Sequence, residues 1–198
     1  MRLFYAVNFK DNIKEALVDN LSEIQKYIIK GNFTEKNNFH ITLVFVGECE
    51  PDKFNDLKKV VDNTVLKLNP TPIKAAIYGL GTFKRPGDEL LWAGVKTNPE
   101  DTDMLNNINK TIVEELAGYD ININDGDKKF KPHVTIARRV EFRKIPGNGF
   151  NDMRQIKFTP INFLIDSLTL MESVQEIKTF GERRYTKIIY NPVYEVKF

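Results

Sequence analysis

The chain has 198 residues, of which 41% are hydrophobic and 28% are charged, and its formal net charge is +2. These values are ordinary for a globular protein and exclude collagen-like and disordered chains. No apolar run approaches the roughly 18–20 residues of a membrane-spanning helix, so we expect no membrane association. The single cysteine, Cys49, cannot form an internal disulfide, which favours a cytoplasmic protein.

Strands and helices are predicted to alternate along the first third of the chain. The pattern predicts a strand at 2–9, an amphipathic helix at 11–29 that ends at Gly31-Asn32, a strand at 39–46, and a second helix from Pro51 that stops before Asn69-Pro70. Helical spacing of the apolar residues, such as Ile13, Leu17 and Ile24, carries the helix predictions.

The rest of the chain is predicted to be richer in strands. We expect strands at 73–83 and 89–96 with a turn at 85–88, a helix at 98–116, a polar loop at 120–129, a strand at 130–137, a loop at 144–152, and strands at 155–158, 161–172 and 184–197. The order of elements indicates an α+β fold in which helices cover two mainly antiparallel sheets.

The two histidines of the chain lie in the same local pattern. Phe39-His40-Ile41-Thr42-Leu43 and Pro132-His133-Val134-Thr135-Ile136 both read apolar or Pro, His, apolar, Thr, apolar, 93 positions apart. Because alternate residues of a strand face the same way, each strand presents an imidazole beside a hydroxyl and buries the intervening apolar residues. The repeat predicts one domain, 1–198, with two lobes, one motif in each, and a shared cleft.

Two such strands suit phosphoester cleavage. A neutral imidazole can take a proton from a nucleophile, an imidazolium can donate one to the leaving oxygen, and Thr42 and Thr135 can donate hydrogen bonds to the phosphate. A zinc enzyme is disfavoured because two His and one Cys reach a usual ligand set only with carboxylates, so we expect no metal and no cofactor. Two unrelated strand histidines are the structural alternative.

Several other residues have both a functional and a structural interpretation. Arg138, directly after the second motif, favours a phosphate or base clamp, whereas Arg139 is expected at the surface. Lys131 shares a strand face with His133 and could raise the local positive potential. Phe45 is either a base-stacking platform or a core residue. We expect Trp92 to pack a lobe, Cys49 to be inert, and Arg183 and Arg184 to lie in a solvated hairpin.

These motifs, in their order, resemble the 2H phosphoesterase superfamily, and within it the RNA 2′,3′-cyclic phosphodiesterases, historically called 2′-5′ RNA ligases. Five stretches carry the resemblance: Arg2–Val7, His40–Gly47, Gly79–Phe83 with Leu91–Val95, Pro132–Arg138 and Leu170–Ser173.

The resemblance implies a bilobal fold with a V-shaped cleft. It also implies hydrolysis of RNA 2′,3′-cyclic phosphate ends to 2′-phosphates, and a weak, reversible joining of RNA through a 2′-5′ bond. His40 would be the acid toward the leaving 3′-oxygen and His133 the base toward water, while Phe45 and Arg138 would hold a nucleobase. Strict strand alternation puts both of those residues on the wrong face, so each strand must bulge or end after its motif.

Two other functions stay open at this stage. The substrate can be RNA with a cyclic phosphate end, or a small cyclic nucleotide or 2′-5′ oligoadenylate handled by the same residues. A protein of a different class, a non-catalytic RNA-end binding module, is the third possibility. In each case we expect a monomer.

Overall fold

The computed structural model describes residues 1–84, 89–121, 123, 130–143, 156–180 and 183–198, without the side chains of 180 and 183–185. The expected turn at 85–88, the loop at 144–152, most of the loop at 120–129, and the side chains of Arg183 and Arg184 therefore lie outside the described residues.

Helices and strands alternate much as predicted. The strands are β1 (Arg2–Asn8), β2 (Ile28–Phe33), β3 (His40–Glu48), β4 (Ile73–Phe83), β5 (Leu90–Thr97), β6 (His133–Phe142), β7 (Ile161–Ile165), β8 (Ser167–Phe180) and β9 (Arg183–Lys197). The helices are α1 (Asp11–Gln25), α2 (Phe54–Leu68) and α3 (Pro99–Gly118), with 3-10 turns η1 (Lys36–Asn38) and η2 (Pro51–Lys53).

The strands form one curled, antiparallel sheet in the order β7-β4-β5-β6-β3-β1-β8-β9, with β2 paired to β6. The two sheets expected from the sequence are its two halves, and they join where Ile41 of β3 pairs with Val134 of β6. These are the central residues of the two His-x-Thr motifs. The α+β class is confirmed, and the fold brings the two motifs together at the centre of the sheet.

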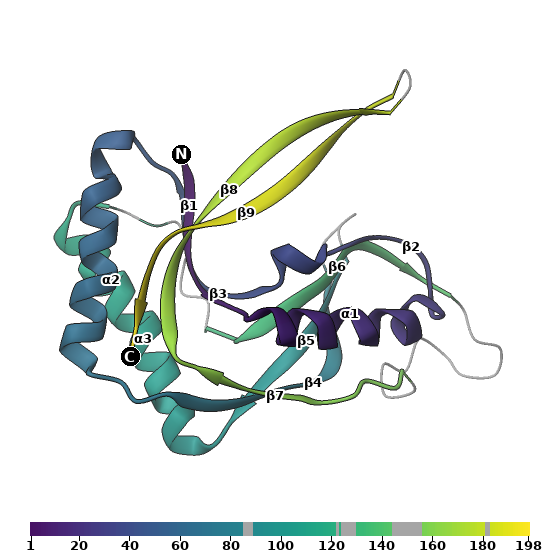
Figure 1. The fold of residues 1–198 in the computed structure, drawn as a ribbon, viewed down its shortest axis with the longest axis horizontal. Coiled ribbons are helices and arrows are strands. Elements are labelled where there is room, and N and C mark those ends of the chain that lie inside the picture. Colours follow the sequence, from purple (N-terminus) through teal and green to yellow (C-terminus); the bar gives the residue numbers. More distant parts are fainter. Residues whose placement is uncertain (85–88, 122, 124–129, 144–155, 181–182) are drawn as a thin grey trace.

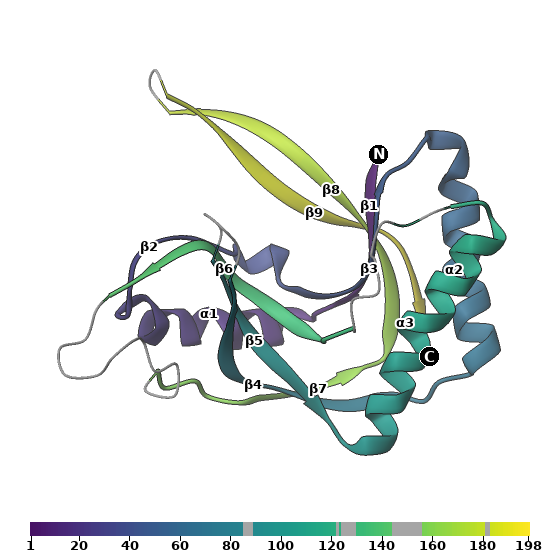
Figure 2. The ribbon, with the colours of Figure 1, turned by 180° about the vertical axis from the view of Figure 1, so that it is seen from behind.

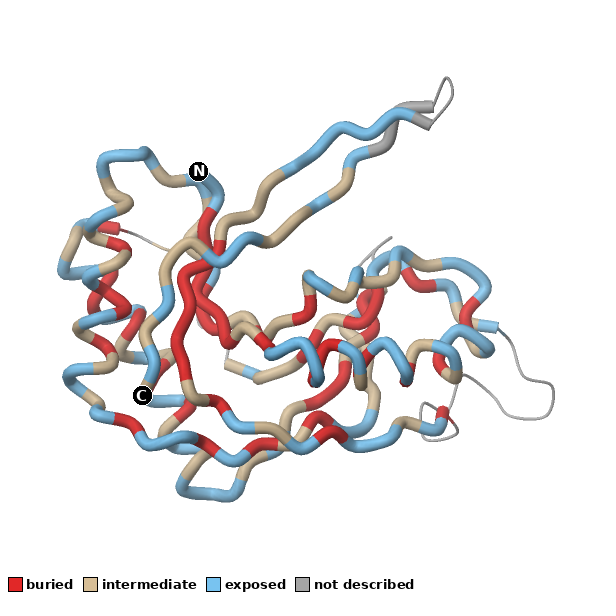
Figure 3. The backbone as a smooth tube through the Cα atoms, viewed as in Figure 1, coloured by how far each residue is buried: buried red, intermediate tan, exposed pale blue. Residues whose placement is uncertain are grey.

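Helices cover the sheet on its outer side. In Figures 1 and 2, α2 and α3 lie side by side against one half and α1 lies along the other, while β8 and β9 extend together as a long arm away from the body. Figure 3 shows buried backbone in the central strands, including the first part of β8, and on the inward helix faces, whereas the outer part of the β8–β9 arm is exposed or intermediate. Each helix buries an apolar stripe at helical spacing: Ile13, Leu17 and Ile24 in α1; Leu57, Val60 and Val61 in α2; Leu105, Ile108 and Ile112 in α3.

Four predicted boundaries were wrong, and the pairing of β2 with β6 explains the first two. The first helix ends at Gln25, and residues 28–33 form β2 because they pair with β6, although Ile28 continues the helical spacing. The strand expected at 130–137 begins at His133 and runs on to Phe142, which gives β2 its partner. Residues 156–158, the described part of the strand expected at 155–158, are not a strand, and the one expected at 161–172 is interrupted at Asp166, after which β8 continues to Phe180.

In the part of the chain that the structure describes, no helix has the length and apolar character needed to cross a bilayer.

Candidate active site

A β-bulge follows the first His-x-Thr motif. Tyr5 of β1 pairs with Val44 and Ala6 pairs with Thr42, so Leu43 is the additional residue of β3. Leu43 and Val44 are both buried, which shifts the alternation of side chains by one residue.

The second motif has a bulge at the same place. Leu91 of β5 pairs with Ala137 and Trp92 pairs with Thr135, so Ile136 is the additional residue of β6. Ile136 and Ala137 are again both buried. Each strand was expected to bulge or end after its motif, and both strands bulge.

Hydrogen bonds from neighbouring elements hold the extra residues. The side-chain amide of Asn109 in α3 donates to the Leu43 carbonyl at 2.8 Å. The backbone N–H of Thr34 donates to the Ile136 carbonyl at 2.9 Å, and its hydroxyl donates to the Thr135 carbonyl at 2.9 Å. The carbonyls that each bulge removes from the ladder thus have partners, so the bulges are stable local features.

The bulges turn residues from both motifs toward one cavity of about 340 Å³. Six residues were predicted to form the catalytic, phosphate-binding and base-binding site. The lining of the cavity includes five of them, which are His40, Thr42, Phe45, Thr135 and Arg138. Arg2 and Arg139 also belong to the described lining, so guanidinium groups surround the cavity and suit it to an anionic ligand. The described lining does not include His133, which lies beside Val134 at the junction of the two halves.

His40 is held on both ring nitrogens. Nδ1 lies 2.7 Å from the carbonyl oxygen of Asn38, which fixes the Nδ1–H tautomer, and Nε2 lies 3.0 Å from the Thr42 hydroxyl. The rings of Phe4 and Tyr190 pack on the imidazole with centroids 4.9 and 5.0 Å away. Burial lowers the pKa of His40 to about 4, and the positive charge of Arg138 adds to this effect, so the free protein holds the imidazole neutral.

His133 has the same backbone contact in different surroundings. Its Nδ1 lies 2.7 Å from the Lys131 carbonyl oxygen. The edge of Phe83 packs on the ring at 5.1 Å and Trp92 lies 6.2 Å away. Burial lowers the pKa of His133 as well, with Arg138 and Lys131 acting in the same direction. Both histidines are therefore set to use Nε2 for proton transfer, in a positive environment.

Phe45 and Arg138 both reach the cavity, but Phe45 already has a cationic neighbour. Phe45 is 41% exposed, which excludes the core interpretation. The guanidinium of Arg2 lies 5.2 Å from the centre of the Phe45 ring. A nucleobase that stacks on Phe45 would therefore share this ring with Arg2, which already makes a cation–π contact with it.

A comparison with known families identifies the fold. The model of the AKAP7 2′5′ RNA ligase-like domain matches residues 6–188, nearly the whole chain. The chain belongs to this family.

Relatives of this 2′5′ RNA ligase-like domain carry one consistent name. A protein of Archaeoglobus fulgidus named RNA 2′,3′-cyclic phosphodiesterase is 32% identical over 140 residues, which cover 70% of this chain and 72% of that protein. A protein of Thermotoga maritima with the same name is 24% identical over 200 residues and matches over 100% of this chain and 96% of its own length.

Solved structures share the fold of this family member. The protein TT0787 of Thermus thermophilus superposes with a TM-score of 0.67 at 23% identity, over 100% of this chain and 97% of that one. E. coli LigT complexed with 3′-AMP superposes with a TM-score of 0.66 at 21% identity, over 99% and 97%. The α+β architecture and the resemblance stated from the motifs are thus confirmed.

Several residues that surround the two histidines of this 2′5′ RNA ligase-like domain could not be identified from the sequence. Trp92, expected to pack a lobe, packs against Gly81 on β4, and the centre of its ring lies 4.4 Å from the Lys131 ammonium, beside His133. Lys131 does raise the positive potential at His133. Asn38, Phe4 and Tyr190 around His40 were missed; only Asn38 carries a signal, since it lies two residues before His40, as Lys131 does before His133.

Cys49 and Arg139 also have defined positions. Burial raises the pKa of the Cys49 thiol, which agrees with an inert cysteine. Arg139 is exposed, as expected, but it stands at the rim of the cavity and adopts a left-handed backbone with φ of 54°.

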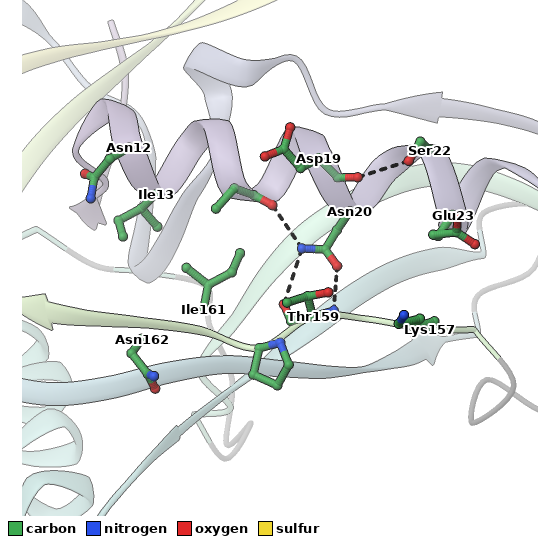
Figure 4. Close-up of a pocket in the computed structure, with 12 residues that line it drawn as sticks. Asn12, Ile13, Asp19, Asn20, Ser22, Glu23, Lys157, Thr159, Ile161 and Asn162 are labelled. Atoms are coloured by element: carbon green, nitrogen blue, oxygen red, sulfur yellow. Dashed lines mark hydrogen bonds between the residues drawn. The ribbon is translucent and has the colours of Figure 1, made fainter.

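A larger cavity of about 640 Å³ lies elsewhere, between α1 and the segment leading into β7 (Figure 4). Asn20 crosses it and holds Thr159 by two hydrogen bonds, so this cavity is a joint between elements. Its described lining contains none of the His-x-Thr residues. Among the described residues, no group of three His, Cys, Asp or Glu side chains is arranged to hold a metal ion.

Proposed function

We propose that this chain is a phosphodiesterase that opens RNA 2′,3′-cyclic phosphate ends to 2′-phosphates. The observation that carries the proposal is the cavity in which the two motifs converge, with imidazole, hydroxyl and guanidinium groups around one space. The relatives' shared name supports the same reaction. RNA or a nucleotide is the substrate class that suits both the positive cavity and an exposed aromatic ring.

The reaction needs two proton transfers and no metal. Water attacks the phosphorus atom and the bond from phosphorus to the 3′-oxygen breaks. His133 accepts the proton of the water, and His40 donates a proton to the leaving 3′-oxygen. The Thr42 and Thr135 hydroxyls donate hydrogen bonds to the non-bridging oxygens, whose charge Arg138 also offsets. The reverse reaction, with a 5′-hydroxyl in place of water, would join RNA through a 2′-5′ bond.

The pKa of His40 adds a condition to this assignment. Since the free protein holds His40 neutral, it takes up its proton when the phosphate anion enters the cavity and raises its pKa. Substrate binding and protonation of the acid are then one coupled event, which keeps the acid uncharged in the empty site.

A nucleobase site adjoins the phosphate. We place the terminal base between Phe45 on β3 and Arg138 on β6, two paired strands whose residues line the same cavity. Stacking and cation–π contacts accept any base, so all four cyclic nucleotide ends should be substrates.

The domain and its setting belong to the same proposal. We assign residues 1–198 to one bilobal domain in which each half supplies one motif, acting as a monomer because both motifs come from one chain. The single cysteine supports a cytoplasmic protein.

A panel of substrates tests the reaction class. RNA with a cyclic end, 2′,3′-cyclic nucleotides, 3′,5′-cyclic nucleotides and 2′-5′-linked dimers are incubated with the wild type, and with the His40→Ala/His133→Ala double variant as a control for contaminating nucleases. We expect turnover of the first two. Turnover of the last two alone would replace the proposal with a small-nucleotide 2H phosphoesterase. Binding without any turnover would indicate an RNA-end binding module.

A further inference from the structure

The side chain of Asn38 joins the arm to the body of the protein. Its amide Nδ2 donates to the Ile188 carbonyl at 2.7 Å, and its Oδ1 accepts from the Tyr190 N–H at 3.0 Å. These bonds cross 150 or more positions of sequence and end on the backbone of β9. Both ends of the amide are used, one as donor and one as acceptor, which an aspartate carboxylate cannot reproduce because it has no donor.

The same residue holds the imidazole of His40. The backbone carbonyl oxygen of Asn38 lies 2.7 Å from His40 Nδ1. The ring of Tyr190 packs against the imidazole at an interplanar angle of 85°. Two of the contacts that orient His40 therefore depend on where β9 lies. Asn38 is the last residue of η1, a single 3-10 turn, so its position is set largely by what it binds.

We propose that Asn38 is a positioning residue that couples the β8–β9 arm to the orientation and tautomer of His40. The inference rests on the proposed function only for its effect on turnover. Anything that moves the arm, including an RNA strand lying along it, moves the two backbone groups that Asn38 holds, and through its carbonyl the Nδ1–H of His40.

The second motif provides the contrast within the molecule. His133 Nδ1 is held by the Lys131 carbonyl, directly before β6, and its ring packs on Phe83 and Trp92 of the sheet itself. Loss of the Asn38 side chain should therefore disturb one proton transfer and leave the other intact.

Asn20 offers a matched control. Its side chain makes the same pair of bonds to backbone, donating to the Thr159 carbonyl at 3.3 Å and accepting from the Thr159 N–H at 2.7 Å (Figure 4). It fastens α1 to the segment before β7, away from the cavity of the two motifs. Asn20 also donates to the Ala16 carbonyl at 2.9 Å and is more buried than Asn38, so Asn20→Ala removes at least as many structural contacts as Asn38→Ala, in a residue whose backbone does not contact a histidine.

The test measures melting temperature, kcat, KM and the imidazole ¹⁵N spectrum of wild type, Asn38→Ala and Asn20→Ala. We expect Asn20→Ala to lose at least as much melting temperature as Asn38→Ala, because Asn20 makes three side-chain hydrogen bonds and Asn38 makes two. In Asn38→Ala we expect kcat to fall roughly 10- to 100-fold with KM changed less than about 3-fold, since misplacing a reacting group by about 1 Å costs on that order. His40 should also lose its fixed Nδ1–H tautomer, while His133 keeps its own, and Asn20→Ala should keep both.

The spectrum separates this inference from the proposed function. If the wild type turns over no cyclic-ended RNA but Asn38→Ala still shows the expected change at His40, the proposed function is overturned and the positioning role is supported. An unchanged His40 tautomer in Asn38→Ala, or equal losses of kcat in the two variants, would overturn the positioning role. If Asn38→Ala does not fold, Asn38→Asp, which keeps the acceptor for Tyr190 N–H and loses the donor to Ile188, should show the same change at His40 or refute it.

Discussion

The two halves of the sheet build their histidine sites by the same backbone device and surround them differently. In both, a carbonyl two residues before the histidine holds Nδ1 at 2.7 Å, and a bulge follows the threonine. His40 is then enclosed by Phe4 and Tyr190 and bonded to the Thr42 hydroxyl. His133 packs against Phe83 and Trp92 and has Lys131 as a cationic neighbour, whereas Arg138 acts on both imidazoles.

The difference teaches which parts of the site come from backbone geometry and which from side chains. The repeat fixes the tautomer of each imidazole and the direction of the residues after each bulge. The packing around each ring then sets its pKa, which is lowered further at His40. In the proposed mechanism His40 therefore acts as the acid only after the phosphate anion has raised its pKa, whereas His133 acts as the base.

Removing either imidazole should give the largest effect. We expect His40→Ala and His133→Ala each to lower kcat about 10²- to 10⁴-fold with the fold retained, because a positioned acid or base contributes on that order. A substrate whose leaving 3′-oxygen is replaced by sulfur, which needs no proton to leave, distinguishes the two halves.

On that substrate His40→Ala should regain most of its rate and His133→Ala should not. Rescue of His133→Ala alone would exchange the two roles, and near-wild-type rates in either variant on RNA would refute the two-histidine mechanism.

The threonine hydroxyls come next. Thr42→Val and Thr135→Val should each lower kcat about 10²-fold, the usual cost of one hydrogen-bond donor to a developing oxyanion. Thr→Ser at each position is the matched control and should stay near the wild-type rate, because it keeps the hydroxyl. Valine variants as active as the serine variants would assign the two hydroxyls a purely structural role.

Phe45 and Arg138 test whether the two bulges serve one base site. Phe45→Ala and Arg138→Ala should raise KM roughly 5- to 150-fold, which corresponds to about 1–3 kcal/mol of stacking, with a smaller change in kcat. Because Phe45 is 41% exposed, the melting temperature of Phe45→Ala should stay close to that of the wild type. A loss of stability with unchanged KM would contradict the base-stacking role of Phe45.

The pKa difference between the halves predicts a smaller effect, on stability. Folding lowers the pKa of His40 from about 6.5 to about 4, so between these pH values the unfolded chain binds more protons and the free energy of unfolding falls as pH falls. The loss is at most about 3–4 kcal/mol, at about 1.4 kcal/mol per pKa unit. Urea unfolding from pH 7 to pH 4 should show a shallower pH dependence in His40→Asn than in His133→Asn. Equal slopes would mean that the two halves do not differ.

Much of this site could be predicted from the sequence because it is local. Strand alternation places His40 with Thr42 and His133 with Thr135, and the apolar residues between them are buried as expected. The need for a bulge followed from the five-residue spacing to Phe45 and Arg138, and both bulges are present.

What escaped prediction depends on distant segments. Tyr190 and Asn38 meet at His40 only because the arm folds back over η1, and Arg2 meets Phe45 through the pairing of β1 with β3. The first two residues of β2, Ile28 and Ile29, were predicted as the end of a helix because Ile28 continues the helical spacing, and only pairing with β6 decides between helix and strand. Such contacts leave no periodic trace in the sequence.

Product analysis on an RNA that ends in a 2′,3′-cyclic phosphate tests the central claim most directly. The wild type, the His40→Ala variant and the His133→Ala variant are compared in excess EDTA, and the position of the product phosphate is determined. We predict conversion to the 2′-phosphate by the wild type, undiminished by EDTA and lost in both variants. A 3′-phosphate product, or activity that EDTA abolishes and zinc restores, would contradict the account.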